Sequence, residues 1–169
     1  MKSTKSIEIY VVDNDPIFLK DFRENFSYDH DYKLYTRSSV QEFLTLLKKQ
    51  NNNDFTIVII DDMIVSHGLN TKSVVEILPM IKNIDKEISV IVLTDSDNGE
   101  LKLSASDLRP DAFIKNDKML YFKLIPTINR IVSKYELKKS KRNMHIAVSI
   151  AAIIIILTII HFVTISIIG

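Results

Sequence analysis

The feature that most constrains this chain is a short apolar run that ends in acid, in which Thr56-Ile-Val-Ile-Ile is followed by Asp61 and Asp62. A run this short and this rich in Ile and Val is typical of a strand buried on both faces, as in the centre of a parallel sheet. Ligands of open α/β sheets bind at the carboxyl ends of such strands. Asp61 is therefore the first candidate for a functional residue.

The first 137 residues alternate between strand patterns and helix patterns. Strands are predicted at 7–12, 32–37, 56–61, 88–93 and 111–115, and helices at 16–26, 39–47, 74–81, 98–108 and 124–135. This alternation predicts an α/β fold with a five-stranded parallel sheet and helices on both faces. Asp15 and Pro16 predict the start of the first helix, as its N-cap and first residue. Pro126 is expected in or near the first turn of the last helix.

The C-terminal segment 144–169 differs in composition from everything before it. No Asp, Glu, Lys or Arg occurs between Ile146 and Ile168, and a helix of this length spans about 34 Å, enough for a hydrocarbon core of ~30 Å. We therefore expect a transmembrane helix at 144–169, after an α/β domain at 1–137 and a basic segment at 138–143. His161 lies within the apolar stretch and is expected to be neutral and hydrogen-bonded.

Charge is distributed unevenly along the chain. There are 22 basic and 21 acidic residues, but six of the basic ones and only one acid, Glu136, lie between residues 130 and 142. A basic excess beside an apolar segment marks the cytoplasmic side of a membrane. We therefore expect a single-pass tail anchor in the inner (cytoplasmic) membrane, with the main domain in the cytoplasm and no nucleic-acid partner. The lack of cysteine excludes disulfides and thiolate metal sites.

Polar residues follow four of the predicted strands. They are Asp13, Asp61, Thr94 and Lys115. Because the carboxyl ends of parallel strands lie at one edge of the sheet, we expect these side chains to gather there. Clustered carboxylates attract a hard cation, and Mg²⁺ prefers one or two carboxylates, a carbonyl and waters, with room for phosphate oxygens. A hydroxyl and an ammonium bind phosphoryl oxygens, and a carboxylate in such a site can itself be phosphorylated.

Four segments of the sequence match one known family. They are Val11-Val12-Asp13-Asn14-Asp15-Pro16, Ile59-Ile60-Asp61, Val92-Leu93-Thr94 and Ala112-Phe113-Ile114-Lys115. Through them the chain, from about residue 7 to residue 137, resembles a response-regulator receiver domain of the chemotaxis type. This resemblance implies a flavodoxin-like fold with the strand order 2-1-3-4-5.

The resemblance also implies roles in phosphoryl transfer. Asp61 would accept a phosphoryl group from a histidine kinase or a phosphotransfer protein, Thr94 would contact that group, and Lys115 would pair with it. Counting from Thr94 at the family's usual spacing reaches Asn116, so the lysine position falls on Lys115 or on Asn116. We prefer Lys115, because an asparagine cannot supply the charge. Phe113 is the candidate for the family's aromatic switch residue.

A magnesium site is implied in the same way. Its ligands would be Asp13, Asn14, Asp61 and the main-chain carbonyl of Met63. Most members of the family have two adjacent acids after the first strand, whereas the second position here is Asn14. A reduced affinity for Mg²⁺ is therefore expected. Asp15 is expected to act as the N-cap rather than as a replacement ligand.

These residues suggest three functional hypotheses. The first is a membrane-tethered receiver that is phosphorylated on Asp61 and signals through a conformational switch, with no enzymatic activity beyond its own phosphorylation and dephosphorylation. The second is a degenerate, unphosphorylated receiver that acts as a membrane-anchored docking module. The third is a phosphatase of the haloacid-dehalogenase type, but there an Asp-Asp pair follows the lysine, whereas Asp61 and Asp62 precede Thr94. Because neighbouring side chains of a strand point to opposite faces, Asp62 is expected to face away from the site or to cap the next turn.

Overall fold

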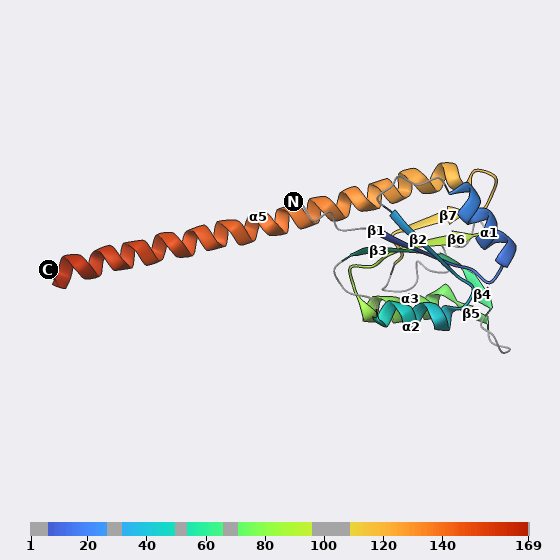
Figure 1. Ribbon diagram of the computed structural model, residues 1–169, viewed down its shortest axis with the longest axis horizontal. Helices are drawn as coiled ribbons and strands as arrows, with labels where there is room; N and C mark the ends of the chain where they lie inside the picture. Colours follow the sequence, from blue (N-terminus) through green and yellow to red (C-terminus); the bar gives the residue numbers. More distant parts are fainter. Residues whose placement is uncertain (1–6, 27–31, 50–53, 66–70, 96–108, 169) are drawn as a thin grey trace. The chain divides into compact units, whose positions relative to one another are not determined.

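The structure is a computed structural model that describes residues 7–26, 32–49, 54–65, 71–95 and 109–168. Its elements (Figure 1) are, in chain order, β1 (Ile7–Val12), α1 (Pro16–Asn25), β2 (Tyr32–Arg37), α2 (Val40–Lys49), β3 (Phe55–Asp61), β4 (Met63–Val65), β5 (Thr71–Ser73), α3 (Val74–Ile84), β6 (Ser89–Thr94), β7 (Ala112–Lys115) and α5 (Leu120–Ile168). The helix predicted at 98–108 lies outside the described residues. The chain forms two compact units, Met1–Ile128 and Asn129–Gly169.

Five parallel strands form the main sheet of the described chain, in the order β2-β1-β3-β6-β7. Ile7 of β1 pairs with Tyr32 of β2 on one side and with Phe55 of β3 on the other. All four strand pairings are parallel, so the carboxyl ends lie at one edge. The predicted five-stranded parallel sheet and its order are confirmed.

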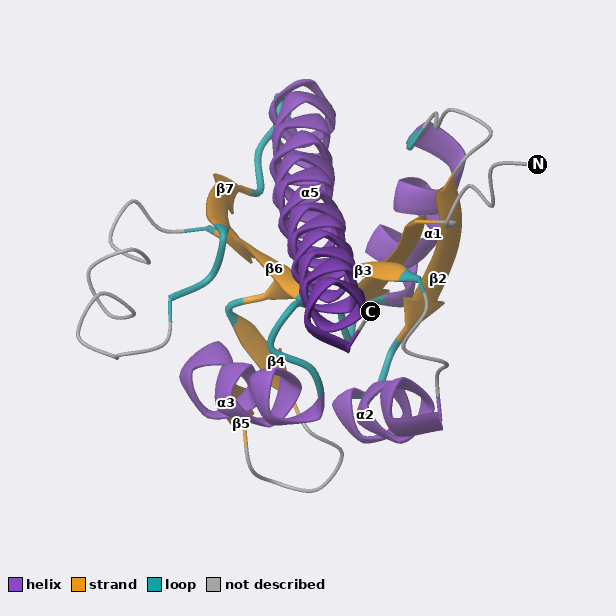
Figure 2. Cartoon of the chain, turned by 90° about the vertical axis from the view of Figure 1, so that its left-hand side faces the viewer, coloured by secondary structure: helices purple, strands orange, loops and turns teal. Residues whose placement is uncertain are grey.

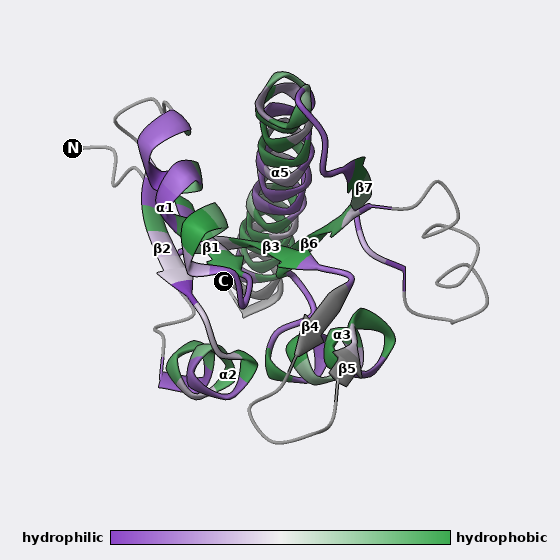
Figure 3. Cartoon of the chain, turned by 90° about the vertical axis from the view of Figure 1, so that its right-hand side faces the viewer, coloured by the Kyte–Doolittle hydropathy of each residue, from purple (hydrophilic) through white to green (hydrophobic). Residues whose placement is uncertain are grey.

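The two strands that carry most of the predicted site are the most deeply buried. The side chains from Ile57 to Ile60 in β3 are fully buried, and β6 is buried along its whole length. Both strands are coloured as hydrophobic in Figure 3. Full burial of one such side chain contributes about 1.5–3 kcal/mol to folding stability. The core packing of β3 and β6 therefore fixes the positions of the residues at their ends.

Helices cover both faces of the sheet. Figure 2 shows α2 and α3 side by side on one face, where they enclose a hydrophobic core cluster with the inward side chains of the strands. Tyr10 of β1 lies in this cluster, with its ring 4.9 Å from the ring of Tyr35 and 5.7 Å from that of Phe43. Phe113 of β7 is partly buried and packs against the same cluster.

On the other face, α1 packs against the first turns of α5 through aromatic rings. Phe22 is fully buried, and its ring lies 5.0 Å from that of Phe26 and 5.6 Å from that of Tyr121. The hydroxyl of Tyr121 donates a hydrogen bond of 2.8 Å to Asp21. These contacts hold the beginning of α5 on the sheet beside α1.

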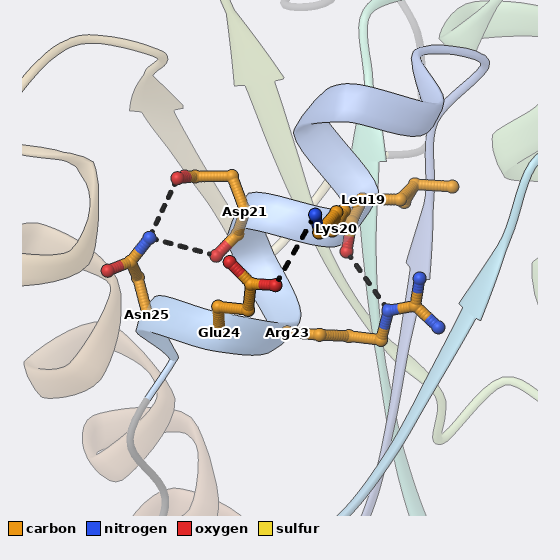
Figure 4. A network of polar contacts seen from close by, with 6 residues as sticks. All are labelled: Leu19, Lys20, Asp21, Arg23, Glu24 and Asn25. Atoms are coloured by element: carbon orange, nitrogen blue, oxygen red, sulfur yellow. Dashed lines mark hydrogen bonds and ion pairs between the residues drawn. The ribbon is translucent and has the colours of Figure 1, made fainter.

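The sequence signals for α1 are borne out in its contacts. The carboxylate of Asp15 accepts a hydrogen bond of 2.8 Å from the N–H of Ile17, and Pro16 begins the helix. This confirms the predicted N-cap. The outer face of the helix satisfies its polar groups internally (Figure 4), for example where the Asn25 amide donates to the carboxylate of Asp21 at 2.7 Å. Asp21 thus accepts hydrogen bonds both from Asn25 within α1 and from Tyr121 of α5.

Two features of the fold differ from the sequence-based expectation. An antiparallel hairpin of β4 and β5 follows β3, where the sequence predicted only a polar loop. The last helix begins at Leu120, so Pro126 lies in its interior rather than in or near its first turn. Pro126 and Phe122 are exposed, so the turn in which the Phe122 carbonyl loses its helical donor lies at the protein surface.

The segment Asn129–Gly169 continues α5 without a break to Ile168. The described side chains from Met144 to His161 are exposed, and they include a dense run of isoleucines. By its length and composition this helix is long and apolar enough to cross a membrane, and it is the one such helix among the described residues. An apolar surface of this size is unusual for a protein in water.

Candidate functional site

The first residue of the site, Asp13, directly follows β1. Its carboxylate is nearly buried, with 6% of the residue exposed, and it accepts a hydrogen bond of 2.7 Å from the N–H of Asp15. The N–H of Asp13 donates to the Arg37 carbonyl at 3.1 Å. Burial raises the pKa of Asp13, the N–H of Asp15 opposes this rise, and the carboxylates of Asp15 and Asp95 add to it. The turn thus fixes a carboxylate at the edge of the sheet.

Asp61 is the last residue of β3 and is partly buried. Burial, as the largest cause, and the neighbouring carboxylates of Asp13, Asp62 and Asp95 together raise the pKa of Asp61 to about 6, against an opposing hydrogen bond with the main chain of Asp62. Carboxylates from the ends of β1, β3 and β6 therefore act on one another. Neighbouring negative charges in a partly buried site disfavour ionisation of each carboxyl group. Binding of a cation or a proton reduces this repulsion.

Thr94 ends β6 and is buried, with 5% exposed. Its hydroxyl donates a hydrogen bond of 2.7 Å to the Oδ2 atom of Asp62. The strand pairing brings the two residues near each other, because Leu93, which precedes Thr94, lies beside Asp61, which precedes Asp62. The expectation that Asp62 faces away from the site is wrong in this respect, because its carboxylate binds a predicted site residue.

Both candidates for the lysine position lie next to Thr94. Lys115 is exposed and pairs with Thr94 in the register of β6 and β7. The N–H of Asn116 donates to the Thr94 carbonyl at 3.0 Å. A hydrogen bond from Lys123 holds the pKa of Asp117 below its usual value, and the charge of Lys115 adds to this effect. Lys115 therefore places a positive charge at the same edge of the sheet, close to Asp117.

The remaining predicted metal ligands lie shortly after the ends of β1 and β3. Asn14 is exposed between the two aspartates that form the turn after β1. Met63 begins β4, and its main chain pairs with Ser73 of β5. Among the described residues, no group of three or more acidic, histidine or cysteine side chains has the arrangement of a metal site. Mg²⁺ needs only one or two carboxylates with a carbonyl and waters, so the pair Asp13 and Asp61 fits this ion.

Sequence reasoning missed two acids of this site. Asp95 follows Thr94 at the end of β6, and its charge raises the pKa of both Asp13 and Asp61. Its position directly after a predicted site residue was the signal that could have identified it. Strand alternation predicts that Asp62 faces away from the site, but β3 ends at Asp61, so the alternation does not apply to Asp62.

Comparison with known proteins gives a consistent result at the level of structure. No family model and no curated protein matches the chain. A response-regulator receiver domain protein from Clostridium thermocellum superposes with a TM-score of 0.64 at 22% identity, over 78% of this chain and 98% of that one. The chain has the receiver-domain fold.

Two further receiver structures support this assignment of the fold. A CheY-like receiver from Methanospirillum hungatei gives a TM-score of 0.62 at 17% identity and covers 79% of this chain and 99% of its own. The beryllofluoride-activated receiver domain of DrrB gives 0.58 at 25% identity, over 76% and 98%. The receiver fold thus accounts for about the first three quarters of the chain, and the apolar end of α5 is additional to it.

Proposed function

We propose that this chain is a membrane-tethered response-regulator receiver that accepts a phosphoryl group on Asp61 from a histidine kinase or a phosphotransfer protein. The observation that supports this most is the meeting of the Asp13 and Asp61 carboxylates at the carboxyl edge of a receiver-type sheet. The chain would act as a signalling domain, and its only chemistry would be its own phosphorylation and dephosphorylation.

The transfer begins at the carboxylate of Asp61. One of its oxygens attacks the phosphorus of the donor, an acyl-phosphate bond forms, and the bond to the donor nitrogen breaks as that nitrogen takes up a proton. A nucleophile with a pKa of about 6 is ~90% ionised at pH 7. The raised pKa thus leaves Asp61 mostly reactive, while its partial burial limits competition from water.

Charge has to be balanced before an anionic donor can approach these carboxylates. Mg²⁺, held by Asp13, Asp61 and the Met63 carbonyl with Asn14 beside them, would offset the charge of the carboxylates and of the incoming phosphoryl oxygens. On the other side, the Thr94 hydroxyl and the Lys115 ammonium would bind phosphoryl oxygens. Movement of Thr94 and of the neighbouring β7, which carries Phe113, would then change the surface that a partner protein contacts.

One observation favours a second function. Asn14 stands where most receivers have a second acid, and it is exposed in the loop after β1. An amide oxygen is a neutral ligand, so Asn14 weakens the attraction for Mg²⁺ compared with a carboxylate. A receiver that cannot bind the ion would serve as a docking module at the membrane without being phosphorylated.

The phosphorylation assay uses the full-length protein in a nonionic detergent with Mg²⁺. Beryllofluoride, a mimic of the phosphoryl group, is titrated and its bound form is followed by ¹⁹F NMR, while acetyl phosphate is used for phosphate-affinity electrophoresis. We expect an adduct in the natural protein and in Asp54→Asn, a matched substitution just before the other end of β3, and none in Asp61→Asn. An adduct in none of the three would favour the docking module.

The membrane tether is the second part of the proposal. It is supported by the exposed isoleucine-rich stretch of α5 and by the basic residues that precede it. The basic side would lie in the cytoplasm, and the receiver would then lie at the inner face of the membrane. Fractionation of cells, followed by alkaline extraction of the membranes, would detect the protein in the extracted pellet. Recovery in the soluble fraction would refute the tether.

A further inference from the structure

One side-chain contact in the site has no role in the proposed transfer. The Thr94 hydroxyl donates to Asp62 at 2.7 Å, within the range of a strong hydrogen bond to a carboxylate. Thr94 is buried and Asp62 is partly buried, so water competes only weakly for either group. This contact joins the ends of β3 and β6 beside the proposed phosphoacceptor.

The main chain of Asp62 is held independently of its side chain. Its N–H donates to the Leu93 carbonyl at 2.9 Å, and its carbonyl accepts a bond of 3.3 Å from the N–H of Val74, the first residue of α3. Asp62 therefore occupies a fixed position between β6 and α3. A substitution of the Asp62 side chain can therefore remove the contact with Thr94 while the main-chain hydrogen bonds to Leu93 and Val74 remain.

A hydroxyl has one proton to donate. While the proton of Thr94 is bound to Asp62, it is not available to a phosphoryl oxygen on Asp61. We infer that Asp62 is a positioning residue that holds the hydroxyl of Thr94 in the unphosphorylated protein and thereby opposes binding of the phosphoryl group. This inference rests on the proposed function, because it requires Thr94 to contact that group.

Two effects of Asp62 must be separated in a test. Its carboxylate binds Thr94, and its charge also acts directly on Asp61. Asp62→Ala removes both effects. Asp62→Asn removes the charge but keeps a neutral acceptor, which forms a weaker bond. Removal of the hydroxyl by Thr94→Ala abolishes the contact from the other side, so an effect of Asp62 that persists in that background is due to charge alone.

The experiment measures the beryllofluoride concentration at half saturation for the full-length protein with Mg²⁺ by ¹⁹F NMR. A hydrogen bond to a charged group of ordinary strength corresponds to about a tenfold change in affinity. We expect Asp62→Ala to bind beryllofluoride about tenfold more tightly than the natural protein, and Asp62→Asn to lie between the two. In the Thr94→Ala background we expect the gain from Asp62→Ala to fall to the smaller part that is due to charge.

The outcomes distinguish this inference from the proposed function. An equal gain in both backgrounds, or no gain in either, would overturn the role of Asp62 while leaving Asp61 as the phosphoacceptor. Binding of beryllofluoride by Asp62→Ala but not by the natural protein would support a strong hydrogen bond between Thr94 and Asp62 that prevents binding. Binding by neither protein would overturn the phosphoacceptor role of Asp61 and the role of Asp62 together. If Asp62→Ala does not fold, Asp62→Asn is compared in the same two backgrounds.

Discussion

Replacement of Asp61 by asparagine should stabilise the folded protein, and the gain should depend on pH. Partial burial and three neighbouring carboxylates raise the pKa of Asp61 from an ordinary value of 3.8 to about 6. Each unit of difference between the folded and unfolded values corresponds to 1.36 kcal/mol. Ionised Asp61 therefore costs the folded state about 3 kcal/mol above pH 7, and an uncharged amide of the same shape removes this cost.

The sign of the pH dependence follows from proton uptake. Because the folded pKa of Asp61 is the higher one, the folded protein binds more protons than the unfolded chain between about pH 4 and pH 6. The free energy of unfolding therefore falls as the pH rises through this window, and it levels off above it. Asp61→Asn should match the natural protein near pH 4 and exceed it by about 3 kcal/mol at pH 7 to 8.

Urea titrations followed by circular dichroism from pH 4 to pH 8, in one nonionic detergent and without divalent ions, measure this difference. Asp54→Asn, made just before the start of β3, is the matched control, and the gain from Asp61→Asn is measured relative to it at each pH. Addition of Mg²⁺ should then stabilise the natural protein more than Asp61→Asn, because an ion that binds the folded state shifts the equilibrium toward it. If Asp61→Asn raises the free energy of unfolding no more at pH 7 than at pH 4, the ionised Asp61 carboxylate does not destabilise the folded protein, and this prediction is wrong.

Three further outcomes test the fold and the tether. Phe22→Ala should lower the free energy of unfolding by about 3–5 kcal/mol, because it leaves a cavity where a fully buried ring was. Phe122→Ala is the control, since Phe122 is 75% exposed, and it should change the free energy of unfolding by less than about 0.5 kcal/mol. Similar losses in the two variants would contradict the packing of α1. Asp15→Ala should lower the free energy of unfolding by about 1 kcal/mol, because it removes the N-cap of α1, whereas Asp15→Ser should retain most of that stability. Equal urea midpoints for these two variants would argue against the cap. Deletion of 144–169 should move the chain from the membrane pellet to the supernatant, and a full-length protein already found in the supernatant would count against the anchor.

The parts of the fold that could be predicted are those set by local patterns. The isoleucine run of β3 has no polar position that could face water, so it indicates a central strand without any knowledge of its neighbours. Asp15 and Pro16 define the start of α1 within two residues, since capping depends only on adjacent main-chain groups. Placement of Asp13 and Asp61 at one edge followed from the parallel sheet alone.

The parts that could not be predicted depend on register and exposure. The bond between Thr94 and Asp62 joins residues that are 32 positions apart, and a shift of one residue between β3 and β6 would remove it. The strands β4 and β5 have three residues each, which is too short for an alternating pattern to be recognised. Pro126 was placed near a helix start because a proline in a helix interior is costly, and only the structure shows that the affected turn lies at the surface.

The order of the strands has a consequence for association between copies of the chain. In the five-stranded sheet of the described chain, β2 and β7 are the edge strands, and hydrogen-bonding groups along their outer sides could pair with a strand of another molecule. β7 has only four residues, which limits any such ladder. β2 is longer, but it carries Lys33 and Arg37, and two copies aligned along it would bring like charges together. The short length of β7 and the basic side chains of β2 therefore disfavour edge-to-edge aggregation of the five-stranded sheet.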